Sequence, residues 1–279
     1  MDTKFINLRF ESNRKVIEVG RGKPYRLLNI EGIEAGEMEL STADNVLYDG
    51  SKIRNRRIKF RPITIECEYT GDDKEAQRRF LAGFFNVHYD GILKIDYAGV
   101  KRETLYIVEG FRAKLENIYN PLRFLVHLYC PDPFWLDNFE ISEEITTWIG
   151  GISFPLKLPT KFSTAGSRII NVVNNGDVET PVKIEIFGPA TNPKIALRET
   201  GDFIRIKDTL TADDIVTITT EFGNKRVEKN GQNAFNILDL PDSTFFSLQV
   251  GDNVIEFTTE DVSNNANAKI SYRNRYLGI

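Results

Sequence analysis

Residues 63–85 read ITIECEYTGDDKEAQRRFLAGFF, and this stretch decides the fold of the first half of the chain. Its first seven residues alternate, which places Ile63, Ile65, Cys67 and Tyr69 on one face and predicts a half-buried strand. A helix over about residues 72–87 is predicted next, starting with a capping box formed by Asp72 and Glu75 or by Thr70 and Asp73. Its apolar residues form a stripe that must pack on a sheet: Ala76, Phe80 and Phe84, with Leu81 and Phe85 beside them.

Strand-like runs lie on both sides of this stretch. Short strands broken by Gly20, Gly22 and Pro24 come before it. The segment Cys130-Pro131-Asp132-Pro133-Phe134-Trp135 closes the region, because its two prolines are incompatible with a helix or a central strand. We therefore predict a β-rich α+β domain over residues 1–138, a β-sandwich or barrel with one helix. The strands expected after the helix are 91–97, 104–109, 113–118 and 123–130.

The second half of the chain has a different pattern. Residues 139–165 combine acidic side chains, Gly150-Gly151 and two prolines, which is typical of an extended connector. From residue 166 to 279, turn signals such as Asn175-Gly176 and Asn230-Gly231 separate short apolar runs. These runs favour an all-β sandwich, so the predicted fold class of the whole chain is mainly β. The expected strands are 182–187, 203–206, 215–219, 254–258 and 268–272.

Composition narrows the class of protein. The 279 residues are 41% hydrophobic and 27% charged with a net charge of −4, which indicates a globular chain without a global attraction to nucleic acid or membranes. No apolar run reaches the roughly 20 residues of a membrane span, and the first ten residues alternate, unlike a signal peptide. We expect synthesis in a cytosol, with Cys67 and Cys130 as free buried thiols rather than a disulfide.

A search for catalytic residues gives none. The two histidines are His127, inside an alternating run, and His88, just after the predicted helix, and both positions favour structural roles. The common nucleophile, phosphate-binding and zinc motifs are missing from the sequence. We expect no enzyme activity, no cofactor and no metal site. A carbohydrate-binding adhesion module for cell-wall glycans is the alternative function, although residues 151–279 contain no Trp and no His to form a sugar platform.

Two oppositely charged segments stand out in the first domain. Residues 31–44 carry only acids and residues 52–61 carry only bases among their charged side chains. The basic run lacks a nucleic-acid-binding motif, so we expect no sequence-specific nucleic acid partner. We predict that the two segments form a long hairpin or arm whose charged edges close a ring of subunits head to tail, and two solvated strand faces remain the alternative. The candidate interface residues are Glu31, Glu34, Glu37, Glu39, Lys52, Arg54, Arg56, Arg57 and Lys59.

Several of these features together resemble the distal tail protein family of long-tailed bacteriophages. The helix between alternating strands and the closing segment 130–135 are similar to the family's ring-forming N-terminal domain. The ordered run from Asn174-Asn175-Gly176 through Ile184–Pro189 to Gly251-Asp252-Asn253 resembles its galectin-like C-terminal domain.

The resemblance implies a structural protein of the virion rather than an enzyme. Family members form a hexameric ring at the tail tip or baseplate, between the tail tube protein and the tail-associated hub protein, around a channel for DNA. The C-terminal domains project outward and offer an anchor for receptor-binding proteins. The resemblance fits a phage, a prophage or a phage-tail-like bacteriocin, with synthesis in the cytoplasm of the bacterial host and no membrane insertion.

Overall fold

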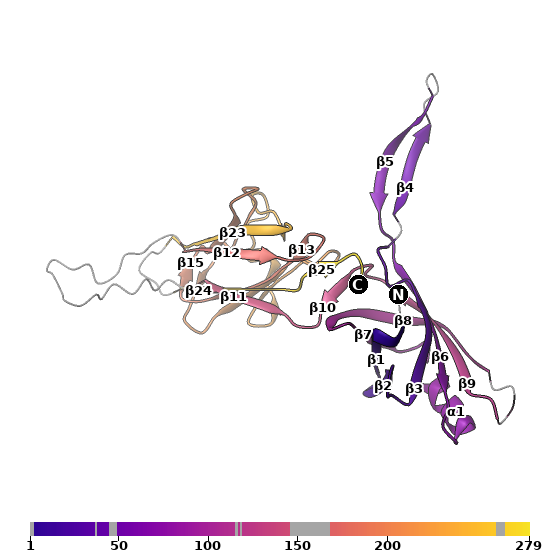
Figure 1. Cartoon of the computed structure of the whole chain (residues 1–279). Helices are drawn as coiled ribbons and strands as arrows, with labels where there is room; N and C mark the ends of the chain where they lie inside the picture. The colour runs from indigo at the N-terminus through magenta and orange to yellow at the C-terminus, as the bar shows by residue number, and fades with distance from the viewer. Residues whose placement is uncertain are drawn as a thin grey trace, which may run out of the picture. The chain divides into compact units, whose positions relative to one another are not determined.

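The computed structural model describes residues 3–36, 38–44, 49–114, 117, 119–145, 168–260 and 266–279. Its fold is mainly β, as predicted, with a single α-helix in these ranges (Figure 1). The chain divides into two compact units. Unit 1 contains Met1–Asn138 together with Arg275–Ile279, and unit 2 contains Phe139–Asn274.

Unit 1 is built around a closed sheet. The strand order is β25-β10-β8-β7-β1-β2-β3-β6-β9, and β9 also pairs with β8, so seven of these strands form a barrel. The link between β2 and β3 is weak, because they meet in parallel through one residue pair, Val19 and Tyr25. The elements are η1 (Thr3–Phe5), β1 (Ile6–Ser12), β2 (Lys15–Val19), β3 (Tyr25–Glu31), β4 (Glu39–Asp44), β5 (Ser51–Arg57), β6 (Arg61–Tyr69), α1 (Lys74–Phe84), β7 (Asp90–Tyr97), β8 (Val100–Lys114), β9 (Leu122–Cys130), β10 (Trp135–Asp137) and β25 (Arg275–Tyr276).

The alternation of β6 and β9 produces the core of the barrel. Ile63, Ile65 and Cys67 point inward and are at most 1% exposed, as their spacing predicted. β9 pairs with β6 along nine residues and buries every second side chain, so the two strands share one apolar face. The burial of each large apolar side chain contributes about 1.5–3 kcal/mol to folding. Cys67 and Cys130 are free and buried, as expected, and burial raises the pKa of the Cys130 thiol to about 11.

Helix α1 lies within the predicted range of residues 72–87, but it is shorter than predicted. Its buried face is also shifted by about one residue from the predicted apolar stripe. Leu81, Phe84 and Phe85 are buried, whereas Phe80 is 39% exposed and Ala76 is also exposed. The Tyr25 hydroxyl donates to Gln77 Oε1 at 2.7 Å, so the line Gln77–Leu81–Phe85 faces the barrel. Aromatic contacts of Phe85 explain which face of the helix is buried. Its ring packs on Phe10 and on Phe111, with 5.2 and 5.5 Å between the ring centroids.

The predicted capping boxes are wrong. Asp73 is the N-cap residue, and its side chain makes no capping hydrogen bond. Glu75 turns instead toward Arg78 and Arg79 on the exposed face, at 2.8 and 3.3 Å. The Arg78 guanidinium, with Arg79, lowers the pKa of Glu75 to about 2. Two arginines within one helical turn outcompete a neutral backbone N–H for this carboxylate.

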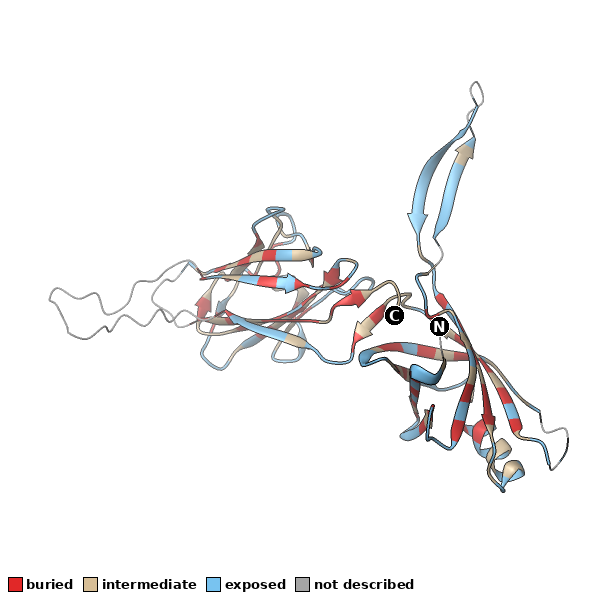
Figure 2. Cartoon of the chain, in the orientation of Figure 1, coloured by how far each residue is buried: buried red, intermediate tan, exposed pale blue. Residues whose placement is uncertain are grey.

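Unit 2 is a β-sandwich of two antiparallel sheets. Their strand orders are β11-β24-β14-β19-β20-β21 and β12-β23-β16-β17. Its core is a separate cluster from that of unit 1 and is rich in Ile, including Ile184, Ile186 and Ile218 at 0% exposure (Figure 2). The strands are β11 (Ile141–Ile145), β12 (Arg168–Asn174), β13 (Thr180–Pro181), β14 (Lys183–Phe187), β15 (Ala190–Thr191), β16 (Lys194–Leu197), β17 (Phe203–Arg205), β18 (Thr209–Leu210), β19 (Ile215–Thr219), β20 (Arg226–Lys229), β21 (Gln232–Asn233), β22 (Ser247–Leu248), β23 (Gly251–Thr258) and β24 (Asn267–Tyr272), with a short helix η2 (Phe235–Ile237).

The unit boundaries differ from the sequence-based boundaries in two places. Residues 141–145, assigned to the connector, form β11, which pairs with β24 of unit 2, while residues 146–165 lie outside the described residues. The last five residues, assigned to the second domain, belong to unit 1, where β25 pairs with β10. A two-residue strand has no sequence period, so its partner could not be read from the pattern.

This return of the chain to unit 1 predicts that a cut chain stays together. With a specific protease site inserted between the exposed residues Asn138 and Phe139, which leaves β11 with unit 2, the two fragments should coelute on size exclusion at micromolar concentration, because Arg275–Ile279 remains paired in unit 1. Changing both Arg275 and Tyr276 to Ala should weaken the association by about tenfold or more. Fragments that separate at once after cleavage of the wild-type sequence would contradict the pairing.

Candidate functional site: an exposed arm and its buried root

The most exposed feature of unit 1 is a hairpin, which we call the arm (β4 and β5). Its strands pair antiparallel from Glu39 opposite Arg57 to Asp44 opposite Ser51, and they stand away from the barrel as a two-stranded ribbon (Figure 1). Every residue of β5 is exposed, and in β4 only Ala43 is partly covered (Figure 2). Isolated two-stranded ribbons are at best marginally stable in water. The arm therefore has the properties of a segment that is completed by a partner.

The two faces of the arm differ in character. Residues directly opposite each other share a face, so Leu40 and Arg56 lie with Thr42 and Ile53 on one face. Leu40 and Ile53 are 50% and 47% exposed, which makes this the apolar face. Arg54 is the extra residue of a bulge, since Asn55 pairs with Ser41 and Ile53 with the next residue, Thr42.

The charged residues predicted as an interface fall into three groups. Glu39 pairs with Arg57 at 3.0 Å and Lys59 at 2.6 Å, so part of the acidic and basic segments meets inside one arm, and these two cations lower the pKa of Glu39. A second group consists of exposed cations without an ion pair to any described residue: Lys52, Arg54 and Arg56. The third group lies before the arm, where the side chain of Glu31 accepts from Asn29 and the backbone of Glu34 joins the root, while Glu37 lies outside the described residues.

The root of the arm is held by Arg61, which the sequence analysis treated as one more base of the charged run. Arg61 begins β6 and is 2% exposed. Its guanidinium donates to backbone carbonyl oxygens from three segments: Gly32 at 2.8 Å and Glu34 before the arm, Pro133 at 2.8 Å, and Leu277 at 2.5 Å. Burial lowers the pKa of Arg61, and no carboxylate of the described residues forms an ion pair with it.

The closing segment 130–135 forms the other half of this root. The Trp135 indole is fully buried, donates to the Ile33 carbonyl oxygen at 3.3 Å, and lies 5.6 Å below the Arg61 guanidinium. Asp132 accepts from Arg275 at 2.8 and 2.9 Å. The two prolines of this segment exclude regular structure around Asp132. The Asp132 carboxylate is thereby available to Arg275, and the Pro133 carbonyl oxygen to Arg61.

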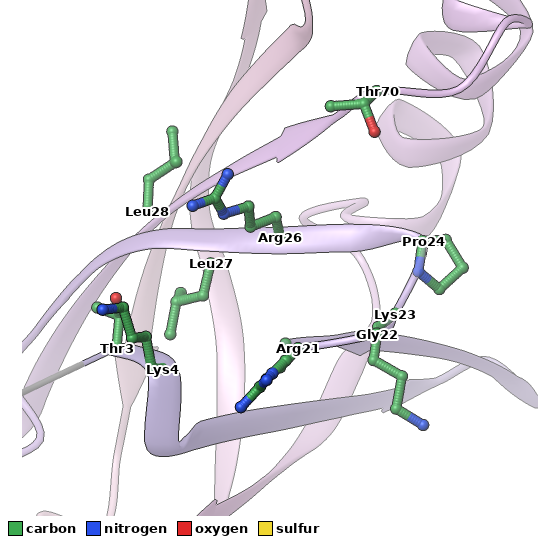
Figure 3. A pocket seen from close by; sticks show the side chains of 11 residues that line it. Thr3, Lys4, Arg21, Gly22, Lys23, Pro24, Arg26, Leu27, Leu28 and Thr70 are labelled. Carbon is green, nitrogen blue, oxygen red and sulfur yellow. The ribbon is translucent and has the colours of Figure 1, made fainter.

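A basic slot is a second candidate in unit 1. The slot is a pocket of about 720 Å³ beside β3, where the single β2–β3 residue pair leaves the sheet open (Figure 3). Lys23 pairs with Glu18 at 2.6 Å and Arg26 lies 3.5 Å from Glu68, so carboxylates partly balance its charge. The cations lining it are Lys4, Arg21, Lys23 and Arg26. Such an open groove suits an extended anionic segment and offers no enclosed place for chemistry.

Both histidines of unit 1 have hydrogen-bond partners close to them. His127 Nδ1 lies 3.1 Å from Thr64 Oγ1 on the neighbouring strand, and the exposed His88 donates through its backbone to Asn86 Oδ1. In the described ranges, His, Cys, Asp and Glu side chains do not gather in threes as metal ligands would. The helices in these ranges are too short or too polar to cross a membrane.

Comparison with known proteins gives one family and one fold. Residues 175–276 match the model of the siphovirus-type tail component, C-terminal domain. No curated protein sequence matches the chain. The crystal structure of SPP1 Dit (gp 19.1), described as a paradigm of the hub adsorption apparatus in phages infecting Gram-positive bacteria, shares the fold at a TM-score of 0.70 and 15% identity, covering 96% of this chain and 98% of that one.

Two further structures, of the phage P2 baseplate in its activated conformation with Ca or Sr, are similar to this chain at TM-scores of 0.54 and 0.53. Their identities are 12% and 11%, and each alignment covers 98% of this chain and 99% of the other. These findings agree with the resemblance seen in the sequence. Residues 175–276 therefore belong to the siphovirus-type tail component family, and the chain as a whole has the fold of a phage distal tail protein.

Proposed function

We propose that this chain is a structural component of a phage tail tip that assembles into a hexameric ring. The ring joins the tail tube protein to the tail-associated hub protein and leaves a central channel for DNA. The observation that carries this proposal is the arm, a two-stranded ribbon with both faces exposed in an isolated subunit. A subunit with such a ribbon gains stability when a second subunit covers it.

The family match and the fold support the place of this ring in the virion. The matched family is a structural tail component, and the similar structures come from an adsorption hub and a baseplate. We therefore propose a virion location at the tail tip, after synthesis in the host cytoplasm, and no catalytic activity. Receptor-binding proteins are further proposed partners.

The structure refines which arm residues would contact the next subunit. Glu39, Arg57 and Lys59 satisfy one another within the arm, so their charges are less available for a partner. The apolar face with Leu40, Ile53 and Arg56, together with the bulge residue Arg54, forms the proposed contact, while Lys52 lies on the other face opposite Ala43. The apolar side chains would supply the affinity of the contact, and the cations would fix its register. A heterologous contact of this kind closes into a ring at a fixed rotation between subunits.

The alternative function, binding of cell-wall glycans, would use a pocket in unit 2. A shallow pocket of about 350 Å³ is lined by Lys225, Arg226, Glu228, Asn233 and Phe235. The rings of Phe235 and Phe245 stack on each other with centroids 6.2 Å apart, and Lys225 covers Phe245 at 5.3 Å. Both rings also pack against the core, so little aromatic surface remains for a sugar. The geometry favours the structural role.

The arm contact is tested by reversing two of its exposed cations, which form no ion pair with a described residue. In a variant with Arg54 and Arg56 changed to Glu, light scattering should find monomers of 31.9 kDa at concentrations where the wild type has six times that mass. Arg57 is left unchanged because it pairs with Glu39. The matched control carries Lys101→Glu and Arg112→Glu, two exposed cations of β8, and should still assemble.

A second variant, with Leu40 and Ile53 changed to Ser, should also lose assembly while its circular dichroism spectrum stays that of a folded subunit. Assembly of both arm variants at the wild-type concentration would show that the arm does not hold the ring. A monomeric wild type at every concentration tested would remove the basis for the ring itself.

A glycan array tests the alternative function. We expect no binding of simple sugars or wall polysaccharides at micromolar concentration, because the aromatic rings of the unit 2 pocket are covered. Micromolar binding that is lost on changing Phe235 to Ala, and kept on changing the exposed Phe222 to Ala, would make unit 2 an adhesin.

A further inference from the structure

Arg61 joins three parts of unit 1 that are far apart in the sequence. Its guanidinium contacts the segment between β3 and β4 at Gly32 and Glu34, the closing segment at Pro133, and Leu277, which is 216 residues away. Because Arg61 is also the first residue of β6, soon after the arm returns to the barrel, it fixes both legs of the arm. We call residues 275–279 the tail.

The tail is held in place by contacts other than Arg61. Tyr276 pairs with Trp135 in the β10–β25 ladder, and its ring lies 3.5 Å from the guanidinium of Arg102. Arg275 binds both carboxylate oxygens of Asp132 and lies 4.3 Å from the Phe134 ring. The tail therefore presents the Leu277 carbonyl to Arg61 from a fixed strand, and it does not depend on the arm for its position.

The tail also touches the arm leg directly. A β-carbon added at Gly278 would lie 3.0 Å from the backbone nitrogen of Ala35 and 3.1 Å from the carbonyl carbon of Glu34. Such contacts are tighter than most β-carbon contacts in proteins, so a side chain at residue 278 would push the backbone at Glu34 and Ala35 outward by a few tenths of an ångström. A buried guanidinium that loses a carbonyl partner still bears the free-energy cost of its desolvation. The arm leg is therefore expected to loosen when Arg61 loses the tail, whereas the tail keeps its other contacts.

We propose that Arg61 and the tail form a latch that sets the direction of the arm, so that an arm ready for docking exists only after the tail has docked. The latch itself is a property of one subunit. Its consequence for assembly rests on the proposed function, in which the arm contacts the next subunit. Arg61 acts as a positioning residue, since it holds the arm without touching the proposed contact face.

Because the tail is synthesised after unit 2, the latch would make assembly depend on synthesis of both units. Residues 275–279 follow all of unit 2 in the chain, although they complete unit 1. A partly made chain therefore has the arm but not its latch, and its arm root stays loose. Subunits would join a neighbour only when unit 2 has been made, which prevents rings that contain incomplete subunits.

Hydrogen exchange on the full-length chain, at a concentration too low for assembly, tests the latch. Gly278→Val and Arg61→Met should each speed exchange at the amides of residues 33–40 and 57–60 by about tenfold or more, while β1 and β7 keep their wild-type protection. The matched controls are Gly83→Val, at a glycine with open space around it, and Arg112→Met, at an exposed arginine, and both should leave the arm root unchanged.

The double variant, Gly278→Val with Arg61→Met, should exchange hardly faster than either single variant, because both changes open the same latch. Arg61→Lys should restore part of the protection, since one ammonium replaces some of the hydrogen bonds. Wild-type exchange at the arm root in Gly278→Val would overturn the latch, and so would equal loss of protection in all strands of Arg61→Met. These readings use unassembled protein, so a failure of the ring proposal would leave them intact.

Discussion

A buried arginine surrounded by backbone carbonyl groups is the interaction on which the root of the arm in unit 1 depends. Arg61 is 2% exposed, and its guanidinium donates to four carbonyl oxygens from three segments. A buried charge of this kind is tolerated only when its donors are satisfied together. The need to satisfy Arg61 fixes the arm leg, the closing segment and the tail in a single arrangement.

The strand order of unit 1 places the tail on an extension of the sheet beyond the closed barrel. The barrel is closed by β8 and β9, whereas β10 and β25 extend the sheet beyond it and carry Trp135 and Tyr276. Arg102 binds the buried carboxylate of Asp137 at 2.7 Å and stacks on Tyr276, so this extension has its own ion pair. The Tyr276 hydroxyl donates to the same Asp137 carboxylate at 3.4 Å, so the tail contacts both members of this ion pair.

Regular spacing of apolar residues along the strands made much of the fold predictable. The alternation at Ile63, Ile65 and Cys67 placed β6 and its buried face, and the strand predicted at 215–219 has the bounds of β19. The charge pattern also predicted a hairpin at the arm. The sequence could not show that Arg61 is buried rather than one more base of that run, because its partners are carbonyl groups 27 to 216 residues away. The sequence also could not show which face of α1 is buried, because this depends on the contacts of Phe85 with Phe10 and Phe111.

The central claim is that isolated subunits expose an arm which a ring of subunits covers. Electron microscopy of the purified full-length chain at high concentration tests it most directly. The account predicts class averages of a six-fold ring with a central opening, in which the arm of each subunit lies against its neighbour. Particles that remain single subunits at every concentration, or a ring in which the arms point into solvent, would contradict it.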